Sequence, residues 1–174
     1  MRRRRRIIGA LRSGLACESG ATAVEFALLA LPFLALLMAM LETALVFFVG
    51  QILQSATADS GRLVMTGQAS GMSTGQFQQA VCSRAYGLFD CSKISVNVQT
   101  FSSFGAITRV NPVQNGKLNP AALTFAVGQP GDIEVVQVFY PWPLGTDLLG
   151  LHLNNVNGDS SLLVATSVFR NEPY

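Results

Sequence analysis

The chain has 174 residues, which leaves room for one modest domain beside a membrane anchor and no more. Hydrophobic residues make up 49% of it, charged residues make up 13%, and the formal net charge is +2. No internal repeat of solenoid length and no long low-complexity tract is found, so the sequence does not predict a repeat array.

The longest apolar run extends from Ala21 to Val49, and only Glu25 and Glu42 interrupt it with charge. A helix rises about 1.5 Å per residue, so about 20 apolar residues cross a hydrocarbon core that is about 30 Å thick. The apolar residues would cover all sides of such a helix, which is not the one-sided stripe of a surface helix. We therefore predict a transmembrane helix over residues 21–50. The length of the run disfavours the alternative, a buried core helix.

Six arginines precede this run, at residues 2–6 and at Arg12, and only Glu18 opposes them. The first twenty residues therefore carry +6 − 1 = +5, and the remainder of the chain carries +2 − 5 = −3. A basic flank beside a membrane span stays in the cytoplasm, which predicts that the C-terminal part is exported. Clustered arginines are also typical of nucleic-acid patches. Their place directly before a membrane span favours a role in orientation, and we expect no nucleic-acid partner.

The order of segments differs from that of a secretory signal peptide. A signal peptide has an apolar core of about 7–15 residues with a small-x-small cleavage site after it. Here the apolar run is longer, and the small residues Ser19, Gly20 and Ala21 come before it. A basic leader, a glycine, a glutamate at the fifth following position (Glu25) and a long apolar helix together resemble a prepilin leader.

The string GATAVEFALLALPFLALLMAMLE is similar to the N-terminal block of TadE-like pilus-assembly proteins, which are minor pseudopilins of tight-adherence (Flp-type) systems. The shared features are Gly20, Ala21, Glu25, Phe26, Pro32 and Glu42. Thr43 departs from the aromatic residue or glycine that often follows the second glutamate. The resemblance implies cleavage between Gly20 and Ala21 by a prepilin peptidase. It also implies that Glu25 pairs with a neighbouring subunit's new amino terminus when pilin-like helices assemble.

Three of these residues have simpler interpretations. Thr22 and Glu25 match the S/T-x-x-E capping box of a helix start, where the helix dipole also favours a carboxylate. Glu42 fits either an acid at the outer membrane interface or a contact with a partner helix, since a deeper charge needs a partner. The sequence leaves both alternatives open. Pro32 removes a backbone donor and is expected to kink or loosen the helix, which membrane helices tolerate.

After Val49 the helix is expected to continue over residues 51–67 as a stem that ends at Gly67. A continuous helix from Thr22 to Thr66 would be about 65–70 Å long. Small residues would let another backbone approach the stem closely. They are Ser55, Ala56, Ala58, Ser60 and Gly61.

Residues 68–174 are predicted to form an exported domain that starts with a short amphipathic helix. Ser73 or Thr74 would cap this helix, and Gly87 would end it. Its apolar face would consist of Phe77, Ala80, Val81 and Tyr86.

Three runs, at residues 93–101, 132–140 and 161–170, are rich in β-branched residues and alternate polar with apolar side chains. This pattern predicts half-buried antiparallel strands. Asn115-Gly116 predicts a loop or a small hairpin between the first two, and a turn at residues 157–159 leads into the third. The predicted fold class is α+β: a long transmembrane helix that continues as a stem, then a short helix and an antiparallel sheet of three or more strands.

The chain has three cysteines. Cys17 would leave with the leader, while Cys82 and Cys91 would remain on the oxidising side of the membrane and are expected to form a disulfide. This bridge would close a loop of about ten residues and stabilise the domain by about 2–3 kcal/mol in the chain-entropy model. No metal site is predicted, because the lone His152 has no ligands at suitable spacing and two cysteines nine positions apart do not form a zinc knuckle.

The sequence shows no nucleophile elbow, P-loop, GxGxxG, HExxH or triad, and acidic residues outside the membrane stand singly. We interpret Trp142, which lies between two prolines, as a packing residue. The prediction is a TadE-like minor pseudopilin of the bacterial inner membrane that is not an enzyme and has no cofactor. Its partners would be the membrane, prepilin peptidase and other pilin-like subunits. The alternative is an uncleaved, signal-anchored envelope protein with a periplasmic binding domain.

Overall fold

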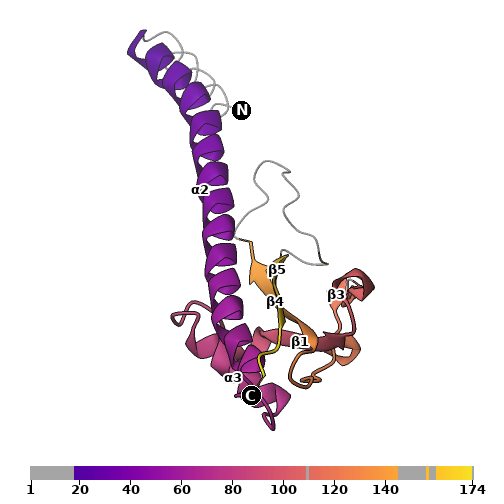
Figure 1. The fold of residues 1–174 in the computed structure, drawn as a ribbon. Helices are drawn as coiled ribbons and strands as arrows, with labels where there is room; N and C mark the ends of the chain where they lie inside the picture. The colour runs from indigo at the N-terminus through magenta and orange to yellow at the C-terminus, as the bar shows by residue number, and fades with distance from the viewer. Residues whose placement is uncertain (1–17, 109, 145–155, 157–159, 174) are drawn as a thin grey trace. The chain divides into compact units, whose positions relative to one another are not determined.

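A computed structural model of the chain describes residues 18–108, 110–144, 156 and 160–173. The chain divides into two compact units, Met1–Leu41 and Glu42–Tyr174, and each is described by itself. Figure 1 labels the elements. The helices and strands are α2 (Glu18–Met65), α3 (Thr74–Ser83), β1 (Ser95–Phe101), β2 (Val113–Gln114), β3 (Lys117–Leu118), β4 (Ile133–Pro143) and β5 (Ser160–Arg170). Short 3₁₀ turns occur at Cys91–Lys93, Phe104–Ala106 and Pro120–Ala122.

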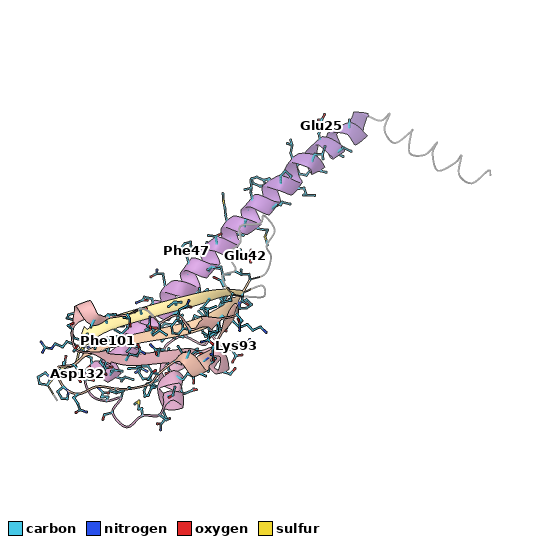
Figure 2. The ribbon with its side chains drawn as sticks, turned by 90° about the vertical axis from the view of Figure 1, so that its right-hand side faces the viewer. Glu25, Glu42, Phe47, Lys93, Phe101 and Asp132 are labelled. Carbon is cyan, nitrogen blue, oxygen red and sulfur yellow. A yellow bond between two sulfur atoms is a disulfide. The ribbon has the colours of Figure 1, made fainter. Side chains whose placement is uncertain are left out.

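The described part of the first unit is the N-terminal half of α2, with Pro32 inside the helix. Its large apolar side chains project from the helix on several sides (Figure 2), and Phe26 and Leu29 are 74% and 73% exposed. Among the described residues, Gly20–Met65 is the one helix long and apolar enough to cross a membrane. The predicted apolar helix is therefore confirmed, and the described part of the chain covers few side chains of its N-terminal half.

The helix starts earlier than the capping pattern predicted. Residues Glu18–Gly20 are already helical, so Thr22 lies within α2 and not at its first residue. The interpretation of Thr22 and Glu25 as a capping box is therefore wrong for this chain, because an N-cap residue has non-helical backbone angles. The rest of the predicted leader, including Cys17, lies outside the described residues.

The C-terminal half of α2 belongs to the second unit and carries a buried stripe. Val49, Leu53, Ala56, Ser60 and Val64 are all buried, at spacings of three or four residues that place them on one helix face. The helix ends at Met65, close to the predicted stop. Gly67 follows at φ 76°, a left-handed conformation that glycine adopts without strain, and its N–H donates to Val64 O at 3.0 Å.

The sheet has the order β1-β4-β5 with antiparallel pairs, so the last two strands in sequence are neighbours (Figure 1). In register, Val138 of β4 lies between Val96 of β1 and Ala165 of β5. These three buried side chains join the core that contains the stripe of α2. The three predicted antiparallel strands are thus confirmed.

The central strand β4 is buried from Ile133 to Tyr140, which means that both faces of the sheet are covered there. It extends past its predicted end through Pro141, Trp142 and Pro143. Two prolines are tolerated in this central strand because β1 begins only at Ser95, which pairs with Phe139, and so does not reach Pro141 or Pro143. Beyond that point one edge of β4 has no strand partner, and a missing N–H on that side breaks no ladder bond.

Helix α3 begins as predicted. Ser73 is its N-cap and forms a capping box with Gln76, in which Ser73 N–H donates to Gln76 Oε1 at 2.8 Å. Phe77 and Val81 are buried as expected. The assignment of Tyr86 to the apolar face is wrong: α3 ends at Ser83, and Tyr86 is 84% exposed at φ 53° because the turn before Gly87 carries its side chain outward.

The hairpin predicted at Asn115-Gly116 is present, between β2 and β3. Both residues have positive φ, 51° and 73°, as a two-residue type I′ turn requires. The turn predicted at residues 157–159 and the residue His152 lie outside the described part of the chain.

Candidate functional site

The residues of the predicted prepilin motif all lie on α2. Gly20 and Ala21 are in the first turn of its described part, and Glu25 is exposed one turn further on. Phe26 is also exposed, and Glu42 is half-buried. Figure 2 shows Glu25 and Glu42 on the same helix. The structure therefore presents the predicted cleavage and assembly residues on an apolar helix and does not gather them into a pocket.

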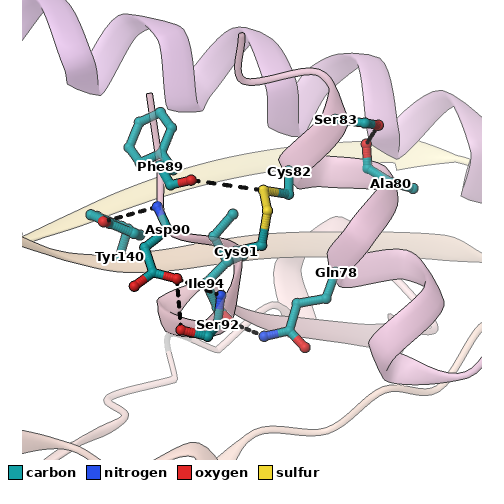
Figure 3. The surroundings of a disulfide bond; sticks show 10 residues. All are labelled: Gln78, Ala80, Cys82, Ser83, Phe89, Asp90, Cys91, Ser92, Ile94 and Tyr140. Atoms are coloured by element: carbon teal, nitrogen blue, oxygen red, sulfur yellow. Dashed lines mark hydrogen bonds between the residues drawn. A yellow bond between two sulfur atoms is a disulfide. The ribbon is translucent and has the colours of Figure 1, made fainter. Parts of the chain in front are cut away.

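The predicted disulfide between Cys82 and Cys91 is present (Figure 3). Its two Cα atoms lie 5.5 Å apart, and it joins the end of α3 to the turn that precedes β1. The Gln78 side chain adds a second tie by donating to the carbonyl of Ile94. Together these contacts fix α3 against the start of the sheet.

Aromatic side chains pack beside the disulfide loop. Phe89 and Tyr140 meet edge to face with ring centroids 4.8 Å apart, and Trp142 lies 6.1 Å from Phe89. Trp142 is half-buried against the core, in agreement with its interpretation as a packing residue. The cluster therefore extends the core to the end of β4.

Asp90 stands at the exposed rim of this loop. Its carboxylate accepts from Ser92 Oγ at 2.7 Å and from Ser92 N at 3.1 Å (Figure 3), and Lys93 Nζ lies 3.7 Å away. The hydrogen bonds from Ser92, with a contribution from the Lys93 charge, lower the pKa of Asp90 below its ordinary value. These contacts cap the 3₁₀ turn at Cys91–Lys93.

A buried polar cluster around Glu134 is the feature that the sequence analysis missed. Glu134 is fully buried on β4, and its Oε1 accepts from Gly128 N, from Thr100 Oγ1 at 3.3 Å and from Asn171 Nδ2 at 3.3 Å. Burial raises the pKa of the Glu134 carboxyl, and these three hydrogen bonds oppose that shift.

Glycine is needed at position 128, because a Cβ there would lie 2.6 Å from Glu134 Oε1. A signal for the cluster was present in the sequence. Glu134 shares the strand parity of Val136 and Val138, so it faces the same side as two core residues. That signal was ambiguous because Ile133 and Val135 make the opposite parity apolar as well.

The opposite face of the sheet bears an apolar groove of about 600 Å³. It lies between the segment around Pro112 and the outward side chains of β4 and β5, among them Phe139, Leu162 and Val164. Its polar lining is limited to hydroxyl and amide side chains such as Thr108, Gln137 and Thr166. In the described part of the chain, no group of three or more His, Cys, Asp or Glu side chains is placed to hold a metal ion.

Comparison with family models matches residues 20–62 to the family described as TadE-like protein. The matched segment begins at the predicted cleavage site and covers most of α2, including Glu25 and Glu42. Comparison with curated proteins and with solved structures found no significant match. The family match and the candidate membrane helix support a pilus-related membrane protein. The resemblance predicted from the sequence is thus confirmed for residues 20–62, and helix α2 carries the TadE-like segment of this chain.

Proposed function

We propose that this chain is a minor pseudopilin that takes part in assembling a tight-adherence (Flp-type) pilus. It would be inserted in the bacterial inner membrane by α2, cleaved between Gly20 and Ala21 by a prepilin peptidase, and then packed through α2 against other pilin-like subunits. The observation that carries this proposal is that the TadE-like match, residues 20–62, falls on a helix whose N-terminal half exposes its apolar side chains.

Charge supports the proposed orientation. The arginines at residues 2–6 and Arg12 precede the apolar segment, and basic residues beside a span stay in the cytoplasm. The domain at residues 68–174 would then be periplasmic, an oxidising compartment in which the Cys82–Cys91 bridge persists.

Cleavage would change the role of Glu25. A mature α2 that begins at Ala21 would bring Glu25 within about one turn of the helix N-terminus, where a carboxylate is favoured by the dipole. In the membrane, the charged Glu25 would need a partner of opposite sign. A neighbouring subunit's new amino terminus is such a partner, and the proposed pair would fix the register between the two helices.

The proposed processing is tested by mass spectrometry of the protein isolated from its own cell envelope. We expect a chain that begins at Ala21 and therefore lacks Cys17 and all six leader arginines. A chain that still begins at Met1 would contradict the pseudopilin proposal. It would favour an uncleaved signal-anchored envelope protein instead.

The assembly role is tested by Glu25→Ala, with the exposed Glu172→Ala as the matched control. We expect normal cleavage in both variants and a loss of assembled pili, on the order of tenfold or more, in Glu25→Ala alone. The reason is that an unpaired amino terminus in an apolar bundle costs more than the 1.4 kcal/mol that corresponds to tenfold. Unimpaired assembly by cleaved Glu25→Ala would remove Glu25 from the mechanism.

A further inference from the structure

Among the described residues, two buried oxygen atoms in the Glu134 cluster have no hydrogen-bond partner, and they belong to two side chains that are already in contact. They are Glu134 Oε2 and Asn171 Oδ1. The Asn171 amide uses both of its hydrogens, since Nδ2 donates to Gln129 O at 3.2 Å and to Glu134 Oε1 at 3.3 Å. Turning the amide over would therefore break two bonds to satisfy one atom.

Neither orphan atom can satisfy the other while Glu134 is ionised. A carboxylate oxygen and an amide oxygen are both acceptors only, whereas a protonated carboxyl has one O–H donor. A buried acceptor without a donor carries the full cost of its lost hydration. A single hydrogen between Oε2 and Oδ1 would remove that cost for both atoms.

We propose that Glu134 keeps its proton in the folded protein and donates it from Oε2 to Asn171 Oδ1. With the observed bond from Asn171 Nδ2 to Glu134 Oε1, this second bond closes a carboxyl–amide ring. Every polar atom of the pair then has a partner. The proton makes this ring a pH-sensitive clasp on the C-terminal end of β5.

The backbone around Asn171 shows what the clasp holds together. Asn171 N–H donates to Asp132 O at 2.8 Å, and Asn171 O accepts from Gly131 N at 3.1 Å. The next residue, Glu172, donates its N–H to Met65 O at 2.9 Å. The clasp thus joins the end of β5 to the turn before β4 and to the last residue of α2.

None of the charged groups near the clasp is placed to stabilise the ionised form of Glu134. Asp132, in the same turn, is negative and acts to raise the pKa of Glu134. The exposed Arg170 side chain makes its hydrogen bond elsewhere: its Nε donates to Gly131 O at 2.7 Å. The remaining charges near this site, Asp59 and Arg62 at the C-terminal end of α2 and Glu172, are exposed, and β1 has none. Among the described residues, no salt bridge involves Glu134.

The direction of the pH dependence follows from the raised pKa of Glu134. Between the ordinary glutamate pKa and the raised one, the folded protein binds a proton that the unfolded chain has released. The contribution of the clasp is therefore fully present below the ordinary value and is lost as the pH rises through the raised pKa. The lowered pKa of Asp90 has the opposite effect, because its contribution to stability is present above the ordinary aspartate pKa and is lost only as the pH falls below it.

The test is urea unfolding of the full chain in detergent micelles across about pH 4 to 8, a range that begins near the ordinary glutamate pKa. Fluorescence of Trp142, the single tryptophan, follows the second unit. We expect the wild-type midpoint to fall as the pH rises. Glu134→Gln should keep the acid-side midpoint and lose this fall, because its Nε2–H can donate to Asn171 Oδ1 in place of the proton. The exposed control Glu172→Gln should follow the wild-type profile.

A second measurement keeps the proposal testable if Glu134→Gln does not fold. Infrared spectra of the wild-type protein should show a protonated-carboxyl band that persists at pH values where exposed carboxyls are ionised. No such band, or a wild-type midpoint that does not fall with rising pH, would overturn the proposal. A folded Glu134→Gln that is less stable than wild type at every pH would also overturn it, and would favour a buried water between an ionised Glu134 and Asn171.

Discussion

The two halves of α2 are one continuous helix, but their side chains have opposite surroundings. In the half that ends at Leu41, large apolar residues such as Phe26 and Leu29 are about three-quarters exposed, at 74% and 73%. In the half that begins at Glu42, Val49, Leu53 and Val64 are at most 2% exposed. The sheet of the same chain covers the second half, whereas the described residues leave the large apolar side chains of the first half exposed.

This contrast explains where polar and small residues occur on the helix. The second half buries Thr57 and Ser60. The Thr57 hydroxyl has a hydrogen-bond partner within the helix, since Thr57 Oγ1 donates to Leu53 O at 2.7 Å. Small residues there were predicted to let another backbone approach closely. At Gly61 the close neighbours are side chains, since a Cβ there would lie 2.9 Å from the Phe169 ring. The groups that approach Gly61 are side chains of Phe169 and Ser167, on β5 of the same chain. The small residues in the sequence indicated that another segment would pack closely on the helix, but they did not indicate which segment.

The largest expected difference between the two halves of α2 comes from truncating one leucine in each half. Leu53→Ala should destabilise the second unit by about 2–5 kcal/mol, because it leaves a cavity between α2 and the sheet. Leu34→Ala, at a position that is 56% exposed, should change the unfolding free energy by less than about 0.5 kcal/mol. Urea unfolding of both variants in micelles, followed by Trp142 fluorescence, measures the difference. Equal effects would mean that the second unit does not cover its half of the helix.

The two described glycines of the second half of α2 allow a finer comparison. Gly61→Ala should cost about 1–3 kcal/mol, because the new methyl group would press on Phe169 and Ser167 of β5. Gly50→Ala meets nothing within 4 Å and should stabilise the helix by about 0.5–1 kcal/mol. Thermal unfolding of each variant should therefore shift in opposite directions. A stabilising Gly61→Ala would show that β5 does not lie close to the helix at this point.

Much of the fold followed from patterns that act over a few residues. The apolar run of α2, the cap at Ser73, the turn at Asn115-Gly116 and the three strands depend on local sequence, and all are present. The Cys82–Cys91 bridge was also predictable, because two cysteines close in sequence remained after the leader was set aside.

The features that escaped prediction depend on distant contacts. Nothing near Glu134 in sequence indicates that Thr100 and Asn171 meet its carboxyl, because these contacts span 34 and 37 residues. Tyr86 was placed on the apolar face by helical spacing, yet the helix had already ended at Ser83. Periodicity cannot show where a helix stops when tertiary packing and a disulfide decide the turn that follows.

The smallest expected effect concerns the edge of the sheet that α2 protects. Gln54 acts as a short strand partner for β5: its Nε2 donates to Thr166 O at 2.9 Å, and its Oε1 accepts from Thr166 N at 3.1 Å. Gln54→Ala should cost about 1–2 kcal/mol, since two hydrogen bonds at an exposed position are lost. Gln51→Ala, an exposed position one turn earlier, changes the helix propensity equally and should cost almost nothing. Hydrogen exchange of the Thr166 amide gives the local readout and should accelerate in Gln54→Ala alone. If the exchange rate of the Thr166 amide stayed unchanged, water would replace the hydrogen bonds of Gln54 without loss of protection. The second half of α2 would then cover the sheet by apolar contact only.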